Sequence, residues 1–327
     1  MLRWRNPEPD IQFKFGQACI AAMAVTETSE SNDQPESFFR SLREDFVVLT
    51  KARLSILVVL TSVFGYFVAT KGSGTFSWGI LFHLVFGTTL AAFGSAVFNQ
   101  LMEVDADAKM RRTSDRPLPA NRIPKPLAFI IGWLLSAFGL IHLGVKVDII
   151  SAAMAAATLL TYLFVYTPLK RISTFNTIVG GVSGALPPLI GWAAGKPEPW
   201  ISGAVFLFLL LFLWQMPHFA AINWMYRDEY KRGGFVMWSN GDETGKLTAK
   251  IAIGFSVLTV LLGALYPLVS STMQGWGAIP CGLLGAIMLW LSIRFFCSGE
   301  RADARRLFFY SLLYLPLMML ASYLAWN

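Results

Sequence analysis

Long apolar stretches separated by short polar ones make up most of the chain from about residue 47 onward. A helix needs roughly 20 consecutive apolar residues to cross the hydrocarbon core of a bilayer, and stretches of this length recur along the sequence. The pattern predicts nine such helices, at about residues 53–70, 77–100, 126–145, 147–166, 174–194, 201–222, 249–271, 276–296 and 307–326. We therefore expect an all-α membrane protein with nine transmembrane helices in one bundle.

Residues 1–46 have a different composition. They are polar, and the run at 26–36 contains only Thr, Glu, Ser, Asn, Asp, Gln and Pro. Such a segment cannot bury an apolar core. No secretory signal peptide is expected, and Glu8 and Asp10 disfavour a mitochondrial transit peptide. The sequence thus predicts a largely disordered cytoplasmic tail over 1–46 and a nine-helix domain over 47–327.

Composition and charge agree with a membrane location. Of the 327 residues, 55% are hydrophobic and 14% charged, and the mean hydropathy is +0.53, values outside the range of ordinary soluble domains. If the N-terminus is cytoplasmic, 24 of the 27 Lys and Arg residues fall on the cytoplasmic side, as the positive-inside rule requires. An odd number of spans then places the C-terminus outside. We expect the inner membrane of a bacterial cell, in preference to a mitochondrial one.

The same data exclude two classes of function. The net charge of +7 is spread over the loops of a membrane protein, so a nucleic-acid partner is not expected. The three cysteines form no CxxC or Cys/His group, which excludes a zinc site and a disulfide framework.

The second predicted helix ends in a row of oxygen-bearing side chains. Asn99, Glu103 and Asp107 are four residues apart, so on a helix they lie along one face at a spacing of roughly 6 Å. Hard oxygen ligands of this kind suit Mg²⁺. Asp105 points to the opposite face and is left out. The alternative is a helix end whose acids simply meet water, but polar groups just inside a membrane boundary are costly unless they line a cavity or bind something.

Basic residues follow this row immediately. They are Lys109, Arg111, Arg112, Arg116 and Arg122. Their density indicates a phosphate-bearing ligand beside the metal. Lys170 closes the fourth predicted helix, in the segment Tyr166–Arg171, and is either a membrane-surface anchor or a further charge for phosphate.

A second polar segment follows the sixth predicted helix. His218 and Glu229 are eleven positions apart and would share a helix face that could lie across a cleft from Asn99, with Asp228 next to Glu229. A histidine in an apolar helix is either a packing residue or a ligand. The glycine-rich stretch 180–195 predicts close helix packing or a wall flattened for a planar ligand.

A metal, a phosphate leaving group and an apolar chamber suit one chemistry in particular. An allylic diphosphate ionises when Mg²⁺ and basic side chains stabilise the departing diphosphate, and aromatic faces stabilise the allylic cation. Several aromatic residues flank the two acidic segments, among them Phe98, Tyr162, Tyr166 and Trp214.

Four segments in order, at 99–118, 166–171, 180–192 and 214–219, resemble the UbiA-type intramembrane prenyltransferases, and specifically their protohaem IX farnesyltransferase (haem O synthase) branch. The resemblance runs from about residue 47 to the end. It implies a nine-helix bundle with a central cavity opening near the cytoplasmic side, which transfers farnesyl from farnesyl diphosphate to a vinyl group of haem B. Addition of water then gives haem O and diphosphate.

The resemblance also implies roles for individual residues. The metal ligands would be Asn99, Glu103, Asp107 and Glu229, with Asp228 also in the catalytic set; Lys109, Arg112, Arg116 and Lys170 would bind diphosphate, and His218 would contact haem. The family usually carries Asp where this chain has Glu103 and Glu229. The implied cofactor is Mg²⁺.

The implied partners are farnesyl diphosphate and haem B as substrates, the lipid bilayer, and a downstream haem-modifying enzyme or terminal oxidase assembly that receives the product. Two alternatives stay open. One is a UbiA-type prenyltransferase acting on an aromatic acid or a chlorophyll-type alcohol. The other is a cation-coupled anion transporter, which is disfavoured because the ionisable groups gather at one face instead of the bilayer midplane.

Overall fold

The computed structural model describes residues 34–71, 74–196 and 200–327. The chain divides into two compact units, Met1–Phe46 and Val47–Asn327. Most of the predicted disordered tail lies outside the described residues. The part that is described, from Gln34 onward, is helical and belongs to α2 (Gln34–Leu49).

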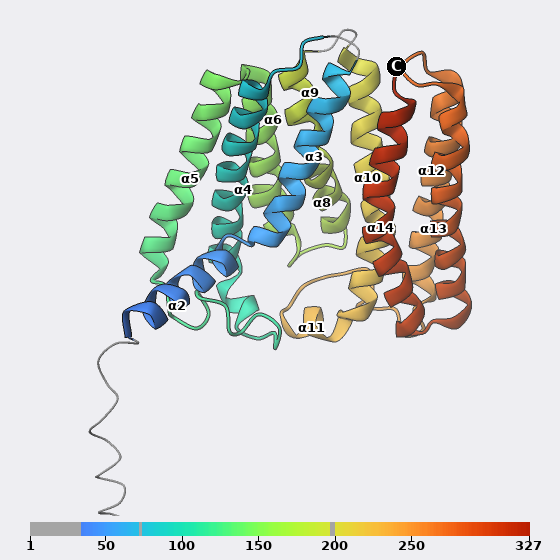
Figure 1. The fold of residues 1–327 in the computed structure, drawn as a ribbon. Coiled ribbons are helices and arrows are strands. Elements are labelled where there is room, and N and C mark those ends of the chain that lie inside the picture. Colours follow the sequence, from blue (N-terminus) through green and yellow to red (C-terminus); the bar gives the residue numbers. More distant parts are fainter. Residues whose placement is uncertain (1–33, 72–73, 197–199) are drawn as a thin grey trace, which may run out of the picture. The chain divides into compact units, whose positions relative to one another are not determined.

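The second unit is a bundle of long helices. Within the described residues, nine helical stretches are long and apolar enough to cross a membrane, which confirms the number predicted and marks the chain as an integral membrane protein. The single-helix spans are α3 (Ala52–Thr70), α4 (Trp78–Asp107), α5 (Lys125–Lys146), α10 (Trp200–Met225), α12 (Lys246–Val269) and α14 (Arg301–Ala325), and a short turn η2 (Gly275–Gly277) leads into α13 (Ala278–Ser298). Figure 1 shows these long helices running side by side.

Two of the nine spans are not continuous α-helices. The fourth consists of α6 (Ile149–Leu160), a π-helical turn η1 (Thr161–Tyr166) and a last turn α7 (Thr167–Leu169). Pro168 has no N–H to donate to the preceding turn and its ring crowds the carbonyl four residues back, which favours the wider π turn. The fifth span is α8 (Asn176–Ala185) followed by α9 (Pro187–Gly195), because two prolines begin the second piece.

Close contact with α3 explains a glycine of the fifth span. A Cβ atom on Gly191 would overlap the backbone carbonyl oxygen of Ser62, and one on Gly65 would overlap that of Pro188. The Ser62 hydroxyl donates to the carbonyl of Pro187 at 2.8 Å. Close packing, the first of the two predictions for this stretch, therefore accounts for Gly191.

We expect Gly191→Ala to lower the free energy of unfolding by about 1–3 kcal/mol, since a backbone carbonyl cannot move aside as a flexible side chain can. Gly254→Ala on α12 is the control. Its Cβ meets nothing within 4 Å, so no loss is expected there. Thermal unfolding of the two variants in detergent measures the difference, and equal midpoints would contradict the packing argument.

The two ends of the bundle differ. At one end, called the site end here, α4 stops at Asp107 and α10 stops at Met225, and the short helix α11 (Arg227–Arg232) lies across it (Figure 1). At the opposite end the Lys71 ammonium donates to the carbonyls of Tyr323 and Trp326, each at 2.6 Å, and so satisfies the last turn of α14.

Candidate active site

The row of oxygen ligands is present on α4. This helix continues past its apolar part as far as Asp107, so Asn99, Glu103 and Asp107 stand on consecutive turns. All three are buried, with 0%, 5% and 1% of their surface exposed, whereas Asp105 is exposed. The four-residue spacing therefore correctly predicted that Glu103 and Asp107 face the interior and that Asp105 faces outward.

Both buried carboxylates of the row are paired with cations. The Lys170 ammonium lies 2.7 Å from Oε1 of Glu103, and Nη1 of Arg116 lies 2.6 Å from Oδ2 of Asp107. Removing either partner would leave a buried charge without compensation. Two of the predicted diphosphate ligands are therefore held directly against the row.

Asn99 has a cationic partner that the sequence did not reveal. The ammonium of Lys51 donates to Oδ1 of Asn99, and the amide nitrogen of Asn99 donates to the hydroxyl of Thr167 at 3.0 Å. Lys51 stands between α2 and α3 in a left-handed conformation with φ of 47°, which turns the chain toward the row. Burial lowers its pKa to about 7, although the charge of Glu103 acts in the opposite direction. In the sequence it resembles any lysine at a membrane surface.

Lys170 is held in place by aromatic rings. Its ammonium lies 4.5 Å from the centre of the Tyr166 ring and 5.6 Å from that of Phe235. Its carbonyl accepts a hydrogen bond from the backbone N–H of Val236 at 2.7 Å. Burial works to lower the pKa of Lys170, but Tyr166 and Glu103 outweigh it and hold the pKa well above its usual range. Of the two predicted roles, a charge inside the site fits this geometry better than a lipid-facing anchor.

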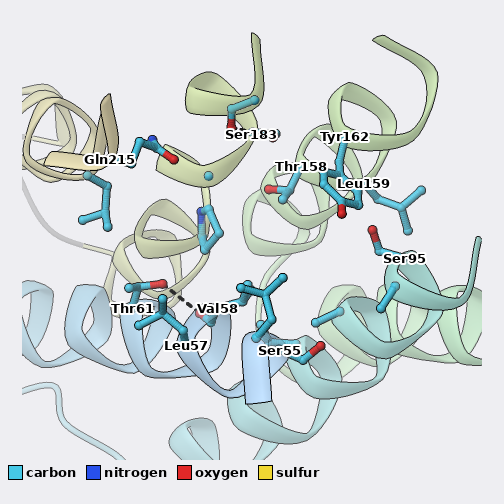
Figure 2. A pocket seen from close by; sticks show the side chains of 18 of the residues that line it. Ser55, Leu57, Val58, Thr61, Ser95, Thr158, Leu159, Tyr162, Ser183 and Gln215 are labelled. Carbon is cyan, nitrogen blue, oxygen red and sulfur yellow. Dashed lines mark hydrogen bonds between the residues drawn. The ribbon is translucent and has the colours of Figure 1, made fainter. Parts of the chain in front are cut away.

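An apolar pocket with a volume of about 290 Å³ begins beside the row. Figure 2 shows its lining side chains, which include Val58 from α3, Ser95 from α4, Leu159 from α6 and Gln215 from α10. Three residues mark the end near the row: Lys51, Tyr162 and Tyr166. The two tyrosine rings are 5.5 Å apart, centre to centre. Thr88 and Ile190 also line the pocket, toward its far end.

His218 forms part of the pocket wall. Its Nδ1 lies 2.7 Å from the hydroxyl of Ser311 on α14, and its ring stacks between Trp214 and Phe308 at 5.4 and 5.0 Å. The face that His218 was expected to share with Glu229 is interrupted, because α10 ends at Met225 and the next residue leaves the helical conformation.

The family model described as the UbiA prenyltransferase family matches residues 58–313, most of the chain. The chain belongs to the UbiA prenyltransferase family. It is therefore a prenyltransferase.

Several relatives of this UbiA chain share the name protoheme IX farnesyltransferase. It is 39% identical to the protoheme IX farnesyltransferase of Opitutus terrae, over 84% of this chain and 92% of the relative. It is 38% identical to the mitochondrial protoheme IX farnesyltransferase of Arabidopsis thaliana, over 83% and 62%. Relatives of this name occur in bacteria, plants and human.

Solved structures support the fold. A digeranylgeranylglyceryl phosphate synthase matches with a TM-score of 0.71 and 16% identity, over 86% of this chain and 97% of that one. A UbiA homologue from Archaeoglobus fulgidus bound to DMAPP and Mg²⁺ matches with a TM-score of 0.63 and 14% identity, over 85% and 98%. At these identities the likeness establishes the shared all-α architecture.

In this UbiA chain Glu229 does not contact the row of Asn99, Glu103 and Asp107 on α4. Its Oε2 accepts a hydrogen bond from the backbone N–H of Arg111 at 2.9 Å, and its Oε1 pairs with Arg232 at 2.9 Å. It thus joins α11 to the loop that follows α4. The neighbouring Asp228 is 81% exposed and approaches Arg227 at 3.9 Å.

The remaining predicted phosphate ligands lie outside the row. Lys109 and Arg112 are exposed, and the guanidinium of Arg112 lies 5.1 Å from the centre of the Tyr226 ring. The structure therefore brings Arg116 and Lys170 into contact with the row. Lys109 and Arg112 stay on the loop that follows α4.

The donor set of the row fits Mg²⁺ by its chemistry. Among the described residues no three His, Cys, Asp or Glu side chains come together as a complete metal site. Mg²⁺, however, is commonly held by one or two carboxylates together with substrate phosphates and water. Glu103 and Asp107 with the amide oxygen of Asn99 match that pattern. Glu229 as a metal ligand stays a prediction.

Proposed function

We propose that this chain transfers a farnesyl group from farnesyl diphosphate to a vinyl group of haem B, with addition of water, to give haem O and diphosphate. The observation that carries the proposal is the buried row of Asn99, Glu103 and Asp107, set against cations at one end of an apolar pocket. The choice of substrates is supported by the shared name of the relatives.

In this proposal the row and its cations bind the diphosphate. Asn99, Glu103 and Asp107 hold Mg²⁺, which when bound neutralises charge on the departing diphosphate. Lys170 and Arg116 lie within 2.7 Å of the carboxylates of the row, and their remaining N–H groups would bind phosphate oxygens. Glu229 with Asp228 on α11, and Lys109 with Arg112 on the loop that follows α4, then act from the site end.

The pocket takes the farnesyl chain. Thr88 precedes Asn99 by three turns of α4, which places it about 16 Å away along the helix. An extended chain whose diphosphate lies at the row therefore has its apolar end near Thr88 and Ile190. Tyr162 and Tyr166 stand where the reacting carbon would be, and their ring faces stabilise positive charge there.

The bond changes follow from this placement. The bond from the first farnesyl carbon to the diphosphate oxygen breaks, and the terminal vinyl carbon of haem forms a bond to that farnesyl carbon. The positive charge passes to the vinyl carbon next to the porphyrin, where water adds and loses a proton. His218, on the pocket wall beside Phe308, is in position to contact the haem.

We place the site end in the cytoplasm, with the N-terminus on the same side and the C-terminus outside, because 24 of the 27 Lys and Arg residues then lie inside. A bacterial inner membrane is the proposed location. The product would pass to a haem-modifying enzyme or an oxidase assembly.

Mass detection of the product tests the reaction. Purified protein given farnesyl diphosphate, Mg²⁺ and haem B is expected to form haem enlarged by one farnesyl group and one hydroxyl group. Chelation of the metal by EDTA should stop product formation, and added Mg²⁺ should restore it. Product from an aromatic acid or a chlorophyll-type alcohol, with none from haem B, would favour the other acceptor; no diphosphate release with any acceptor would favour transport.

A further inference from the structure

Ser311 on α14 determines which nitrogen of His218 carries the proton. The hydroxyl of Ser311 has a single hydrogen, which it donates to the carbonyl of Phe308 at 2.6 Å. The contact of 2.7 Å between this hydroxyl and Nδ1 of His218 therefore requires the imidazole to donate. In its neutral form His218 is then protonated at Nδ1, and Nε2 keeps its lone pair.

The ring of His218 is also fixed in orientation. It stacks between Trp214 and Phe308, with interplanar angles of 24° and 26°. The indole N–H of Trp214 donates to the carbonyl of Ser311 at 2.6 Å, and Ser311 is fully buried. These contacts leave Nε2 as the polar atom that His218 offers to the pocket it lines.

Gln215 provides a second acceptor on the same wall of the pocket (Figure 2). Its amide nitrogen donates to the carbonyl of Gly181 at 2.6 Å, which identifies the other end of the amide as the oxygen. Gln215 precedes His218 by three residues on α10, so the two side chains are neighbours on one face. Among the described residues, neither Oε1 of Gln215 nor Nε2 of His218 has a hydrogen-bond partner.

This wall lies close to the tyrosines of the pocket. Gly180 and Gly184 are one turn apart on α8. A Cβ atom on Gly180 would touch the ring of Tyr166, and one on Gly184 would touch the amide of Gln215. Tyr166 and Gln215 therefore cover neighbouring turns of one face of α8, roughly 6 Å apart. Because α8 leaves the site end and α10 returns to it, His218 lies one turn back from Gln215, toward the depth of Tyr166 (Figure 1).

Two acceptors on neighbouring turns suit a water molecule. A water that donates one hydrogen to each of them keeps a lone pair directed away from both, and is therefore held as a nucleophile. Once it adds to a cation this water must lose a proton, and an apolar pocket holds no bulk water to take it. A neutral imidazole nitrogen is a suitable base for that proton.

We propose that Gln215 and His218 bind the water that adds to the vinyl carbon next to the porphyrin, that Nε2 of His218 takes its proton, and that Ser311 is the positioning residue that holds His218 in the required tautomer. This inference rests on the proposed function. The water oxygen forms a bond to the cationic carbon while one of its O–H bonds breaks, and that proton passes to Nε2. The imidazolium returns the proton to solvent when the products leave. The competing role for Nε2, as a ligand of the haem iron, is an outcome of the test.

A distinctive product reveals the loss of this water. A vinyl-derived cation that water does not capture loses a proton from the neighbouring carbon, which gives an alkene one water lighter than the alcohol. Mass detection measures the ratio of alcohol to alkene within the product formed, so the ratio does not depend on how much of the protein is folded. We expect Ser311→Ala and His218→Gln each to lower it about tenfold or more, since a positioned base commonly contributes about 10²–10⁴ in rate.

The matched control is Ser322→Ala. Ser322 is a fully buried serine on the same helix as Ser311 but does not line the pocket, so the ratio should stay at the wild-type value.

Nuclear magnetic resonance of the imidazole nitrogens tests the tautomer directly. The chain has three histidines, so loss of a signal in His218→Gln identifies His218 in isotope-labelled protein. In wild type and in Ser322→Ala we expect the proton on Nδ1 and a free Nε2. In Ser311→Ala we expect a mixture of the two tautomers, because the acceptor that selects one of them is gone.

Several results would overturn the inference. An unchanged ratio of alcohol to alkene in both Ser311→Ala and His218→Gln would do so and leave the proposed function standing. If His218→Gln kept the ratio but changed the absorption spectrum of bound haem, Nε2 would be assigned to the iron. A proton on Nε2 in wild type would remove Ser311 as the positioning residue. If wild type forms no farnesylated haem at all, the proposed function fails, and this inference fails with it.

Discussion

Asp107→Asn is expected to lower kcat/KM for farnesyl transfer by about a hundredfold or more, while the protein stays folded in the membrane. The amide has nearly the same shape as the carboxylate and can still accept a hydrogen bond from Arg116, which lies 2.6 Å away. It lacks the negative charge that, under the proposed function, would hold Mg²⁺ at the row. Loss of one preorganised electrostatic interaction at a reacting centre commonly costs about 10²–10³ in rate.

The matched control is Asp105→Asn, two residues earlier on the same helix but exposed. It removes the same charge from the opposite face, so its rate should stay within about twofold of wild type, as for most surface changes. Both variants are assayed for farnesylated haem by mass detection. A near-normal rate for Asp107→Asn would remove Asp107 from the metal site.

The second large effect concerns the Glu103–Lys170 pair. Lys170→Met is expected to lower the free energy of unfolding by about 3–5 kcal/mol, because it leaves the Glu103 carboxylate buried without its partner at 2.7 Å. The double variant Glu103→Leu/Lys170→Met removes both charges and should recover most of that loss. Activity should stay low in both variants, since neither retains the proposed metal ligand Glu103 together with the proposed phosphate-binding cation Lys170.

Unfolding titrations in mixed micelles measure the stability of wild type, single and double variants, and product formation measures their activity. If the single and double variants were equally unstable, the cost would come from lost packing against Tyr166, and not from an unpaired charge. If the double variant recovered activity, neither residue would be part of the catalytic set.

The sequence predicts the number of spans and the row on α4 because both depend on local periodicity. Apolar length decides whether a helix crosses the membrane, and a four-residue spacing decides which side chains share a face. The same reasoning correctly separated Asp105 from its buried neighbours. A pattern read over one or two helical turns is reliable wherever the helix is regular.

Partners from distant segments are not predictable in this way. Lys51 meets Asn99 across 48 positions, and nothing near Lys51 in sequence distinguishes it from a surface anchor. His83 on α4 and His142 on α5 are 59 positions apart in sequence, yet their Nδ1 and Nε2 atoms lie 3.1 Å apart. Only the packing of α4 against other elements brings these groups together.

Irregular helix geometry limits prediction for a second reason. The face expected to join His218 to Glu229 assumed one continuous helix, but the backbone changes direction at Tyr226, where φ is −114°. The π turn before Pro168 likewise rotates Tyr162 and Tyr166 relative to a regular helix. A wrong assumption about one residue's conformation changes the direction of every side chain beyond it.

The cations around the α4 row also determine how the site balances charge. Lys51, Lys170 and Arg116, when all are protonated, outnumber the carboxylates of Glu103 and Asp107 by one positive charge. Under the proposed function, a prenyl diphosphate trianion with one Mg²⁺ would bring one negative charge, so the loaded row would be electrically neutral at the edge of a low-dielectric medium. Cleavage leaves an inorganic diphosphate with a further ionisable oxygen and no apolar tail. The departing diphosphate would carry one more negative charge than the prenyl ester, so charge balance at the row would favour the substrate complex over the product complex and aid release of diphosphate.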